Sequence, residues 1–212
     1  DAVVPTVSAS HPDIKTILAI GLRRDAAYNI WVTGRYKTWN QLYGIKGTQK
    51  DLHIYTRSDA CGAGDVWSKY FGKKQEDLLG VGVFGDPGIA TAVQRDPYGI
   101  GYNNIAYAYD IRTKKPNPGI KVIPLDLNNN RKIDADENFY ETLTDLLNAI
   151  ASGKYPFPPA RDLYFVTKGK PSNPIVIAFI KWVLTDGQKF VTESGYIHFS
   201  QEKLTSELKK IQ

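Results

Sequence analysis

The stretch of this sequence most suited to chemistry is YTRSDACGAGDVW, residues 55–67. Arg57 and Asp59 lie two positions apart, small residues follow at 60–64, and apolar residues then recur at helical spacing. The N-terminus of a helix presents unpaired N–H groups and a partial positive charge, and small residues let a tetrahedral anion approach that backbone. We therefore predict an oxyanion-binding turn between a strand and a helix.

Each charged residue of this turn has a distinct expected role. Arg57 can offer a bidentate fork to two oxygens of the anion. An ionised Asp59 would accept a hydrogen bond from hydrogen phosphate and repel sulfate, which carries no proton at neutral pH. The alternative is a plain local ion pair in which Asp59 or Ser58 caps the helix.

A second informative stretch, DLNNNRKIDADE at residues 126–137, has the spacing of a calcium loop of the EF-hand type. Position six is Arg131, where glycine normally makes the sharp turn, so we expect about 1 kcal/mol of local strain there. A strand is expected before the loop and a helix after it, which favours one structural Ca²⁺ over a sensor pair. An asparagine-rich surface turn without metal is the alternative. The predicted ligands are Asp126, Asn128, Asn130, Lys132 through its carbonyl, Asp134 and Glu137.

The composition is that of a globular protein, with 42% hydrophobic and 23% charged residues among 212. The net charge of +5 comes from scattered Lys and Arg residues, which argues against a nucleic-acid groove. The single cysteine, Cys61, excludes an internal disulfide. No apolar run reaches the length of a membrane span, and no signature of an organic cofactor is present.

Predicted strands and helices alternate along the chain, which indicates an α/β fold with an open mixed sheet and flanking helices. We place a lobe boundary at the Pro- and Lys-rich connection 112–119, giving an anion-binding lobe at 1–110 and a C-terminal portion of another lobe at 111–212. Strands are expected at 2–8, 51–56, 80–85, 99–110, 120–127 and 162–169, and helices at 62–71, 88–96, 139–153 and 173–195.

Four segments, in order, resemble the extracytoplasmic phosphate-binding proteins of ABC importers, which are periplasmic binding proteins of type II. The family has Arg-Ser-Asp before a Ser-Gly-Thr turn, and this chain has Arg57-Ser58-Asp59 before Cys61-Gly62-Ala63. GRYKTWNQL at 34–42 resembles its Gly-Lys-Ile-x-x-Trp segment, and RDPYGIGYNNIAYAY at 95–109 its Pro-Gly-x-Ile-Gly-Tyr strand. FIKWVLTDGQKFVTESGYIHFS at 179–200 resembles its closing helix.

The resemblance implies a receptor, not an enzyme, that captures phosphate between two lobes and delivers it to a membrane permease. The implied phosphate ligands are Arg57, Ser58, Asp59, Cys61, Gly62 and Ala63. The resemblance also implies an extracytoplasmic location, with a lipid anchor upstream of residue 1 left open.

Two departures from the family pattern leave alternatives open. Cys61 and Ala63 replace two hydroxyl donors, so another oxyanion such as sulfate, molybdate or tungstate remains an alternative ligand. The chain also begins after the family's first segment, so we expect either a fragment or a second chain that completes the cleft. The remaining hypotheses are a phosphoester enzyme, for which no general base is evident, and a calcium-stabilised surface module that binds no solute.

Overall fold

The computed structural model describes residues 1–47 and 49–211, and they form two compact units. The larger unit runs from Ala2 to Arg161. The smaller unit contains Asp1 and the residues from Asp162 onward. Each unit is described by itself.

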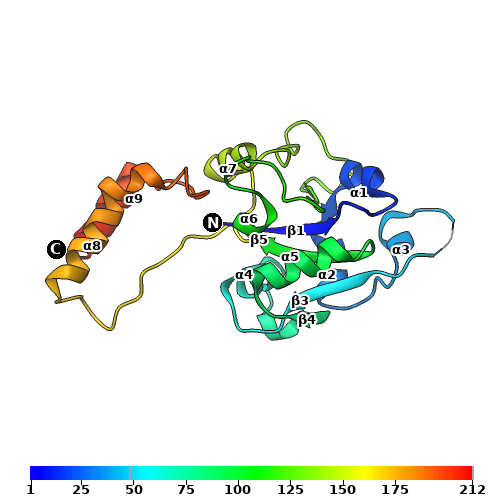
Figure 1. Cartoon of the computed structure of the whole chain (residues 1–212), viewed down its shortest axis with the longest axis horizontal. Helices are drawn as coiled ribbons and strands as arrows, with labels where there is room; N and C mark the ends of the chain where they lie inside the picture. The colour runs from blue at the N-terminus through cyan, green and yellow to red at the C-terminus, as the bar shows by residue number, and fades with distance from the viewer. Residues whose placement is uncertain (48, 212) are drawn as a thin grey trace. The chain divides into compact units, whose positions relative to one another are not determined.

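A five-stranded mixed sheet is the centre of the larger unit (Figure 1). Its strand order is β4-β3-β5-β1-β6. The strand β3 is parallel to both β4 and β5, whereas β1 is antiparallel to β5 and to β6. The bounds are β1 Val3–Ser8, β3 His53–Arg57, β4 Val81–Val83, β5 Gly99–Asn104 and β6 Ile120–Val122. A separate parallel pair joins β2, Leu22–Arg23, to β7, Leu125–Asp126.

Helices cover both faces of this sheet because successive side chains of a strand point to opposite sides. At Gly101 of β5, a Cβ atom would meet Ile89 and Val93 of α5 at 2.7 and 2.9 Å, so only glycine lets α5 pack this closely. The next residue, Tyr102, stacks on Trp67 of α4. The helices of the unit are α1 Ile14–Ile20, α2 Arg24–Trp31, α3 Trp39–Tyr43, α4 Gly62–Tyr70, α5 Gly85–Arg95, α6 Ile105–Ala108 and α7 Leu143–Ala151, with a 3₁₀ turn, η1, at Gln75–Asp77.

The smaller unit contains α8, Pro174–Leu184, the 3₁₀ turn η2, Asp186–Phe190, and α9, Gln201–Lys209. Helix α8 begins at an Asn173 cap and has proline in its first turn, where a missing N–H costs nothing. Within the described residues, no helix of either unit is long and apolar enough to cross a membrane.

The predicted fold class, a mixed α/β architecture with an open sheet and flanking helices, is confirmed. The strand predicted at 51–56 corresponds to β3, and the helix predicted at 62–71 corresponds to α4. The strand predicted at 99–110 is correct only to Asn104, because Ile105 and Ala108, three positions apart, are buried together on the helix α6. The strand predicted at 120–127 is divided into β6 and β7.

Two predictions for the smaller unit are wrong. No strand is assigned among residues 162–169, since none of the described residues of this unit offers a sheet with which to pair. The helix predicted at 173–195 ends at Leu184, and Gly187 then packs too closely against Trp182 for a Cβ atom. On α8, Ile180 is buried whereas the adjacent Phe179 is 52% exposed.

The two units divide between Arg161 and Asp162, whereas the predicted lobe boundary lies near residue 110. Strand β6 follows that predicted boundary but pairs with β1 through Thr6–Val122 and Ser8–Ile120, so it belongs to the sheet that carries the Arg57 turn. The Pro- and Lys-rich connection is therefore a loop within the larger unit.

The buried side chain of His11 predicts a pH-dependent stability. His11 packs edge-on against Trp39 at 4.4 Å, and burial lowers its pKa from 6.5 to about 4, an effect that Asp13 opposes and Lys50 reinforces. The unfolded chain therefore binds more protons between pH 6.5 and 4, and stability falls as the pH falls through this window, by on the order of 2–3 kcal/mol. Urea unfolding across this range should show a flatter profile for His11→Phe. His198→Phe, which removes an exposed histidine, is the control and should keep the wild-type profile. A wild-type free energy of unfolding that does not change between pH 6.5 and 4 would contradict the prediction.

Candidate anion-binding site

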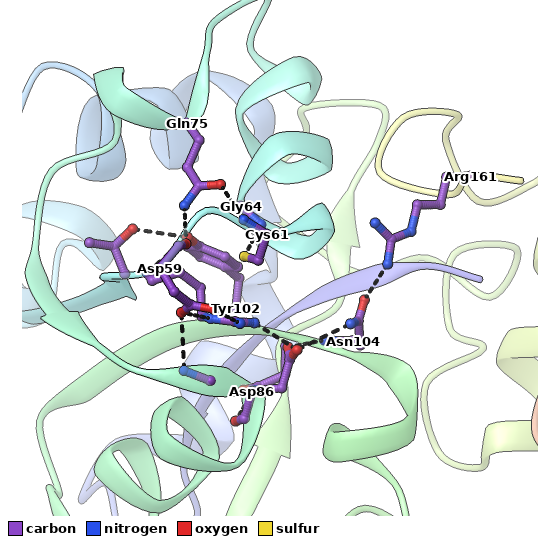
Figure 2. A network of polar contacts seen from close by, with 12 residues as sticks. Asp59, Cys61, Gly64, Gln75, Asp86, Tyr102, Asn104 and Arg161 are labelled. Carbon is purple, nitrogen blue, oxygen red and sulfur yellow. Dashed lines mark hydrogen bonds and ion pairs between the residues drawn. The ribbon is translucent and has the colours of Figure 1, made fainter. Parts of the chain in front are cut away.

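Three parallel strands end at one edge of the sheet, and each delivers polar groups there (Figure 2). Arg57 is the last residue of β3, and Asp59 follows it in the turn. Strand β4 is followed by Gly85 and Asp86 at the start of α5, and Asn104 ends β5. Ligand sites in open α/β sheets lie at such carboxyl ends.

The guanidinium of Arg57 is the central group of this edge. Its Nε donates to Oδ1 of Asp59 at 2.8 Å, and its Nη2 donates to Oδ2 of Asp59 at 2.6 Å. Its Nη1 donates to Oδ2 of Asp86 at 2.6 Å. The side chain of Arg57 is only 6% exposed. Because a guanidinium has five N–H donors, two remain beyond these three bonds for a ligand.

The electrostatics of the cluster favour the ionised forms. Hydrogen bonds from Arg57 hold the pKa of the Asp59 carboxyl well below its usual range, and the backbone N–H of Gly85 acts in the same direction. The same contact with Asp59 raises the pKa of Arg57 further above its ordinary value. One guanidinium thus faces two carboxylates, Asp59 and Asp86, so these three side chains carry an excess of one negative charge.

A glutamine side chain fixes the conformation of the turn itself. Gln75 donates from Nε2 to the carbonyl of Asp59 at 2.6 Å and accepts from the N–H of Cys61 at 3.0 Å. Gly64 permits this approach, because a Cβ there would lie 2.6 Å from Gln75. The N–H of Cys61, a predicted phosphate donor, is therefore occupied by Gln75.

Helix α4 is capped by Cys61, whose Sγ accepts from the N–H of Gly64 at 3.3 Å. The alternative in which Ser58 or Asp59 caps the helix is therefore wrong, although the local ion pair between Arg57 and Asp59 is present. The N–H groups of Gly62 and Ala63 occupy the first helical turn, where no intrahelical acceptor exists. Of the predicted backbone donors, these two remain for an anion.

Two buried hydroxyl groups, those of Tyr102 and Thr56, hold the backbone at the start of the turn in place. The hydroxyl of Tyr102 lies 2.9 Å from Oγ1 of Thr56 and accepts from the N–H of Arg57 at 3.1 Å. Ser58, the remaining predicted ligand, donates its N–H to the carbonyl of Val83 at 3.0 Å and thereby joins the turn to β4. The site is thus held on strands β3, β4 and β5.

Sequence reasoning missed Asp86, Asn104 and Gln75. Asp86 and Asn104 contact each other, since Nδ2 of Asn104 donates to Oδ2 of Asp86 at 3.3 Å. A usable signal existed for Asp86, because it directly follows the strand predicted at 80–85 and the ends of parallel strands meet. Asn104 gave no such signal, because it lies within the strand predicted at 99–110. Nothing in the sequence points to Gln75, because it lies in the 3₁₀ turn η1 and does not follow the end of a strand in the sequence.

The loop at 126–137 is organised by its two buried carboxylates. Asp126 accepts from the N–H of Asn130 at 3.2 Å and from the N–H of Arg131 at 2.8 Å. Glu137 accepts from the N–H groups of Leu127 and Asn128 at 2.8 and 3.0 Å. Arg131 has φ of +65°, the left-handed conformation expected at position six of such a loop.

The side chains of this loop fit a cation less well than its backbone does. The amides of Asn128 and Asn130 donate to Asp134, and the ammonium of Lys132 also binds that carboxylate and lowers its pKa to about 2. Within residues 1–47 and 49–211, no group of three or more His, Cys, Asp or Glu side chains is arranged to hold a metal ion. Calcium binding therefore stays a prediction.

The double pairing of Arg57 predicts a large loss of stability on its removal. Arg57→Ala leaves Asp59 and Asp86 without their partner, so the free energy of unfolding should fall by about 3–5 kcal/mol. Urea unfolding at pH 7 measures this change. Arg35→Ala removes an exposed arginine of the same unit and should cost less than about 0.5 kcal/mol. Equal losses in the two variants would contradict the assignment.

Solved structures with the same fold include three bacterial proteins. A possible phosphate-binding protein from Planctomyces limnophilus has a TM-score of 0.66 and 18% identity, with coverage of 100% of this chain and 69% of that chain. An ABC-type phosphate transport receptor from Vibrio cholerae has a TM-score of 0.63 and 18% identity, with coverages of 94% and 70%. A putative phosphate ABC transporter substrate-binding protein with bound phosphate, from Clostridium perfringens, has a TM-score of 0.61 and 19% identity, with coverages of 94% and 69%. At these identities the likeness shows the fold.

The sequence itself identifies the family. No curated protein matches the chain. A family model for the PBP superfamily domain matches residues 1–187, which is most of the chain and includes the whole unit with the Arg57 turn. The chain therefore belongs to the family described as the PBP superfamily domain.

Proposed function

We propose that this protein is an extracytoplasmic solute-binding protein that captures phosphate for an ABC importer. The observation that carries the proposal is the buried Arg57–Asp59 pair beside the N-terminus of α4, at the edge where β3, β4 and β5 end. The names of the three solved structures support phosphate as the ligand, since all three refer to phosphate binding or transport.

The pair can recognise the protonation state of the anion. Oδ1 of Asp59 already accepts from Nε of Arg57 and from the N–H of Gly85, whereas Oδ2 accepts from Nη2 of Arg57. A carboxylate oxygen has two lone pairs, so Oδ2 can accept one more hydrogen bond. Hydrogen phosphate supplies a P–O–H donor for it, whereas sulfate would place a bare oxygen against the carboxylate.

Capture without chemistry fits the groups of the site. Arg57 and the N–H groups of Gly62 and Ala63 are donors, and Asp59 is held in its ionised form, so the site binds an oxyanion and orients its proton. We propose delivery to a membrane permease as the subsequent step. A segment or second chain that completes the cleft, and an upstream lipid anchor, stay predictions.

The anion selectivity of the site gives the direct test. The wild-type chain should release heat on titration with phosphate and none with sulfate near neutral pH. Asp59→Asn should bring sulfate binding to within about tenfold of phosphate, because an amide can donate to a sulfate oxygen where the carboxylate only repels it. Asp65→Asn removes an equal charge from the first turn of α4, where Asp65 is 49% exposed, and should leave the selectivity unchanged. Unchanged selectivity in Asp59→Asn would contradict the proton-recognition argument.

We propose in addition that the loop at 126–137 binds one structural Ca²⁺. The left-handed Arg131 at position six and the buried carboxylates of Asp126 and Glu137 at positions one and twelve support this second proposal. Lys132 would contribute its backbone carbonyl. Its ammonium would release the carboxylate of Asp134, which would then bind the ion.

Calcium should raise the thermal midpoint, because an ion that binds only the folded chain stabilises it by mass action. Differential scanning calorimetry with excess calcium or with chelator measures the shift. Asp134→Asn, at position nine, should reduce the shift, whereas Asp136→Asn, at the non-ligand position eleven, should retain it. Identical wild-type midpoints in calcium and chelator would overturn this proposal.

A further inference from the structure

Asp86 is the second carboxylate on the guanidinium of Arg57, and the proposed recognition of phosphate does not use it. Its Oδ2 accepts from Nη1 of Arg57 at 2.6 Å, and its side chain is only 13% exposed. Asp59 by itself binds Nε and Nη2 of Arg57 through both of its oxygens. The negative charge of Asp86 is therefore additional to an ion pair that is already complete.

The carboxylate of Asp86 is fixed beside Arg57 by the end of β5. Its Oδ2 also accepts from Nδ2 of Asn104 at 3.3 Å, and its Oδ1 accepts from the N–H of Asn104 at 3.4 Å (Figure 2). Nδ2 of Asn103 donates to the backbone carbonyl of Asp86 at 3.1 Å. Because a carboxylate oxygen has two lone pairs, Oδ2 of Asp86 has none left for a ligand, unlike Oδ2 of Asp59.

A fixed negative charge at this place weakens the binding of any anion by Arg57. An oxyanion on the remaining donors of the guanidinium would lie within roughly 7 Å of the Asp86 carboxylate, which is less than the Debye length of about 8 Å at physiological salt. Repulsion over such a distance near a protein surface corresponds to a factor of about ten or more in affinity. This repulsion depends on the charge of the anion, whereas the contact with Asp59 depends on its proton.

We propose that Asp86 sets the anion affinity of the site by repulsion, while Asp59 sets its selectivity. The inference rests on the proposed function, since it concerns the same anion on the same arginine. A receptor that hands its ligand to a permease must also release it, and repulsion from Asp86 shortens the lifetime of the complex. Asp86 is thus an affinity-determining residue that does not itself bind the anion.

Calorimetric titration of the 212-residue chain and its variants with phosphate and sulfate tests this role. Asp86→Asn keeps the shape of the side chain and removes its charge, so it should tighten phosphate binding by about tenfold. Phosphate should remain preferred over sulfate, because Asp59 is unchanged. A purely structural role for Asp86 predicts the opposite sign, since damage to the site would weaken binding. Asp59 and Arg161 are common to wild type and variant, so the difference reports Asp86 alone.

A second neutral variant and a charged one separate the charge of Asp86 from its shape. Asp86→Ser should also tighten phosphate binding, and it provides the test if Asp86→Asn does not fold. Asp86→Glu keeps the charge, so its affinity should stay closer to that of the wild type than the affinity of either neutral variant. Circular dichroism establishes beforehand which variants are folded.

Asp25→Asn is the matched control, because it removes the same charge from the first turn of another helix of the larger unit. Asp25 is in the first turn of α2, and its side chain is 58% exposed. Its neighbour Arg24 donates to the carbonyl of Tyr70, the last residue of α4. Asp25 is therefore separated from the anion turn by the length of α4, roughly 12 Å. Its removal should leave phosphate affinity within about twofold of wild type.

The remaining outcomes distinguish this inference from the proposed function. Phosphate affinity that is unchanged or weaker in the folded neutral variants would overturn the role of Asp86 and leave phosphate capture intact. Equal tightening in Asp86→Glu, or loss of the preference for phosphate in Asp86→Asn, would overturn it as well.

Wild-type binding of sulfate but not phosphate would overturn phosphate capture. The same variants titrated with sulfate would then test Asp86, and tightening is again the expected result. If the wild type binds neither anion, binding by the neutral variants would support the inference, whereas the absence of heat in every variant would overturn both proposals.

Discussion

The shared guanidinium of Arg57 is the interaction on which this edge of the molecule depends. It connects β3 to Asp59 in the turn and to Asp86 at the start of α5, so one side chain joins two of the three parallel strand ends. An ion cluster this buried is stable only if every charge is paired, because desolvation of an unpaired charge costs several kcal/mol. The pairing therefore holds the strand ends together before any ligand is present.

That constraint also shapes how the site can recognise an anion. Because Asp59 is held ionised, it acts only as an acceptor, and in the proposed function discrimination would depend on whether the ligand brings a proton. Three N–H donors of Arg57 bind the carboxylates of Asp59 and Asp86, so the positive charge of Arg57 is partly neutralised within the protein. Its attraction for an anion is weaker for that reason. In the proposed site, attraction for an anion then comes mainly from the helix end, through the N–H groups of Gly62 and Ala63.

The smaller unit shows how a correct local pattern can mislead about packing. The apolar residues of α8 recur at helical spacing and the helix forms, yet Ile180 is buried while Phe179 and Trp182 are 52% and 45% exposed. Periodicity reports which side chains share a face of the helix, and only the surrounding elements determine whether that face is covered. The strand predicted at 162–169 is wrong for a related reason, since a strand exists only where another strand pairs with it.

The sequence by itself determined the α/β class and the strand–turn–helix around Arg57 and Asp59, including the helix α4, because these follow from local spacing and small residues. It also determined the left-handed conformation of Arg131 in the loop at 126–137, where the ligand spacing marked the turn position. Only the tertiary structure decided that Asp86, Gln75 and Asn104 lie beside the Arg57 turn, since they are 16 to 45 positions beyond Asp59 in the sequence. It likewise decided that the N–H of Cys61 is taken by Gln75 and leaves the anion to Gly62 and Ala63. Such choices depend on which long-range partners compete for a polar group, and no local pattern in a chain records that competition.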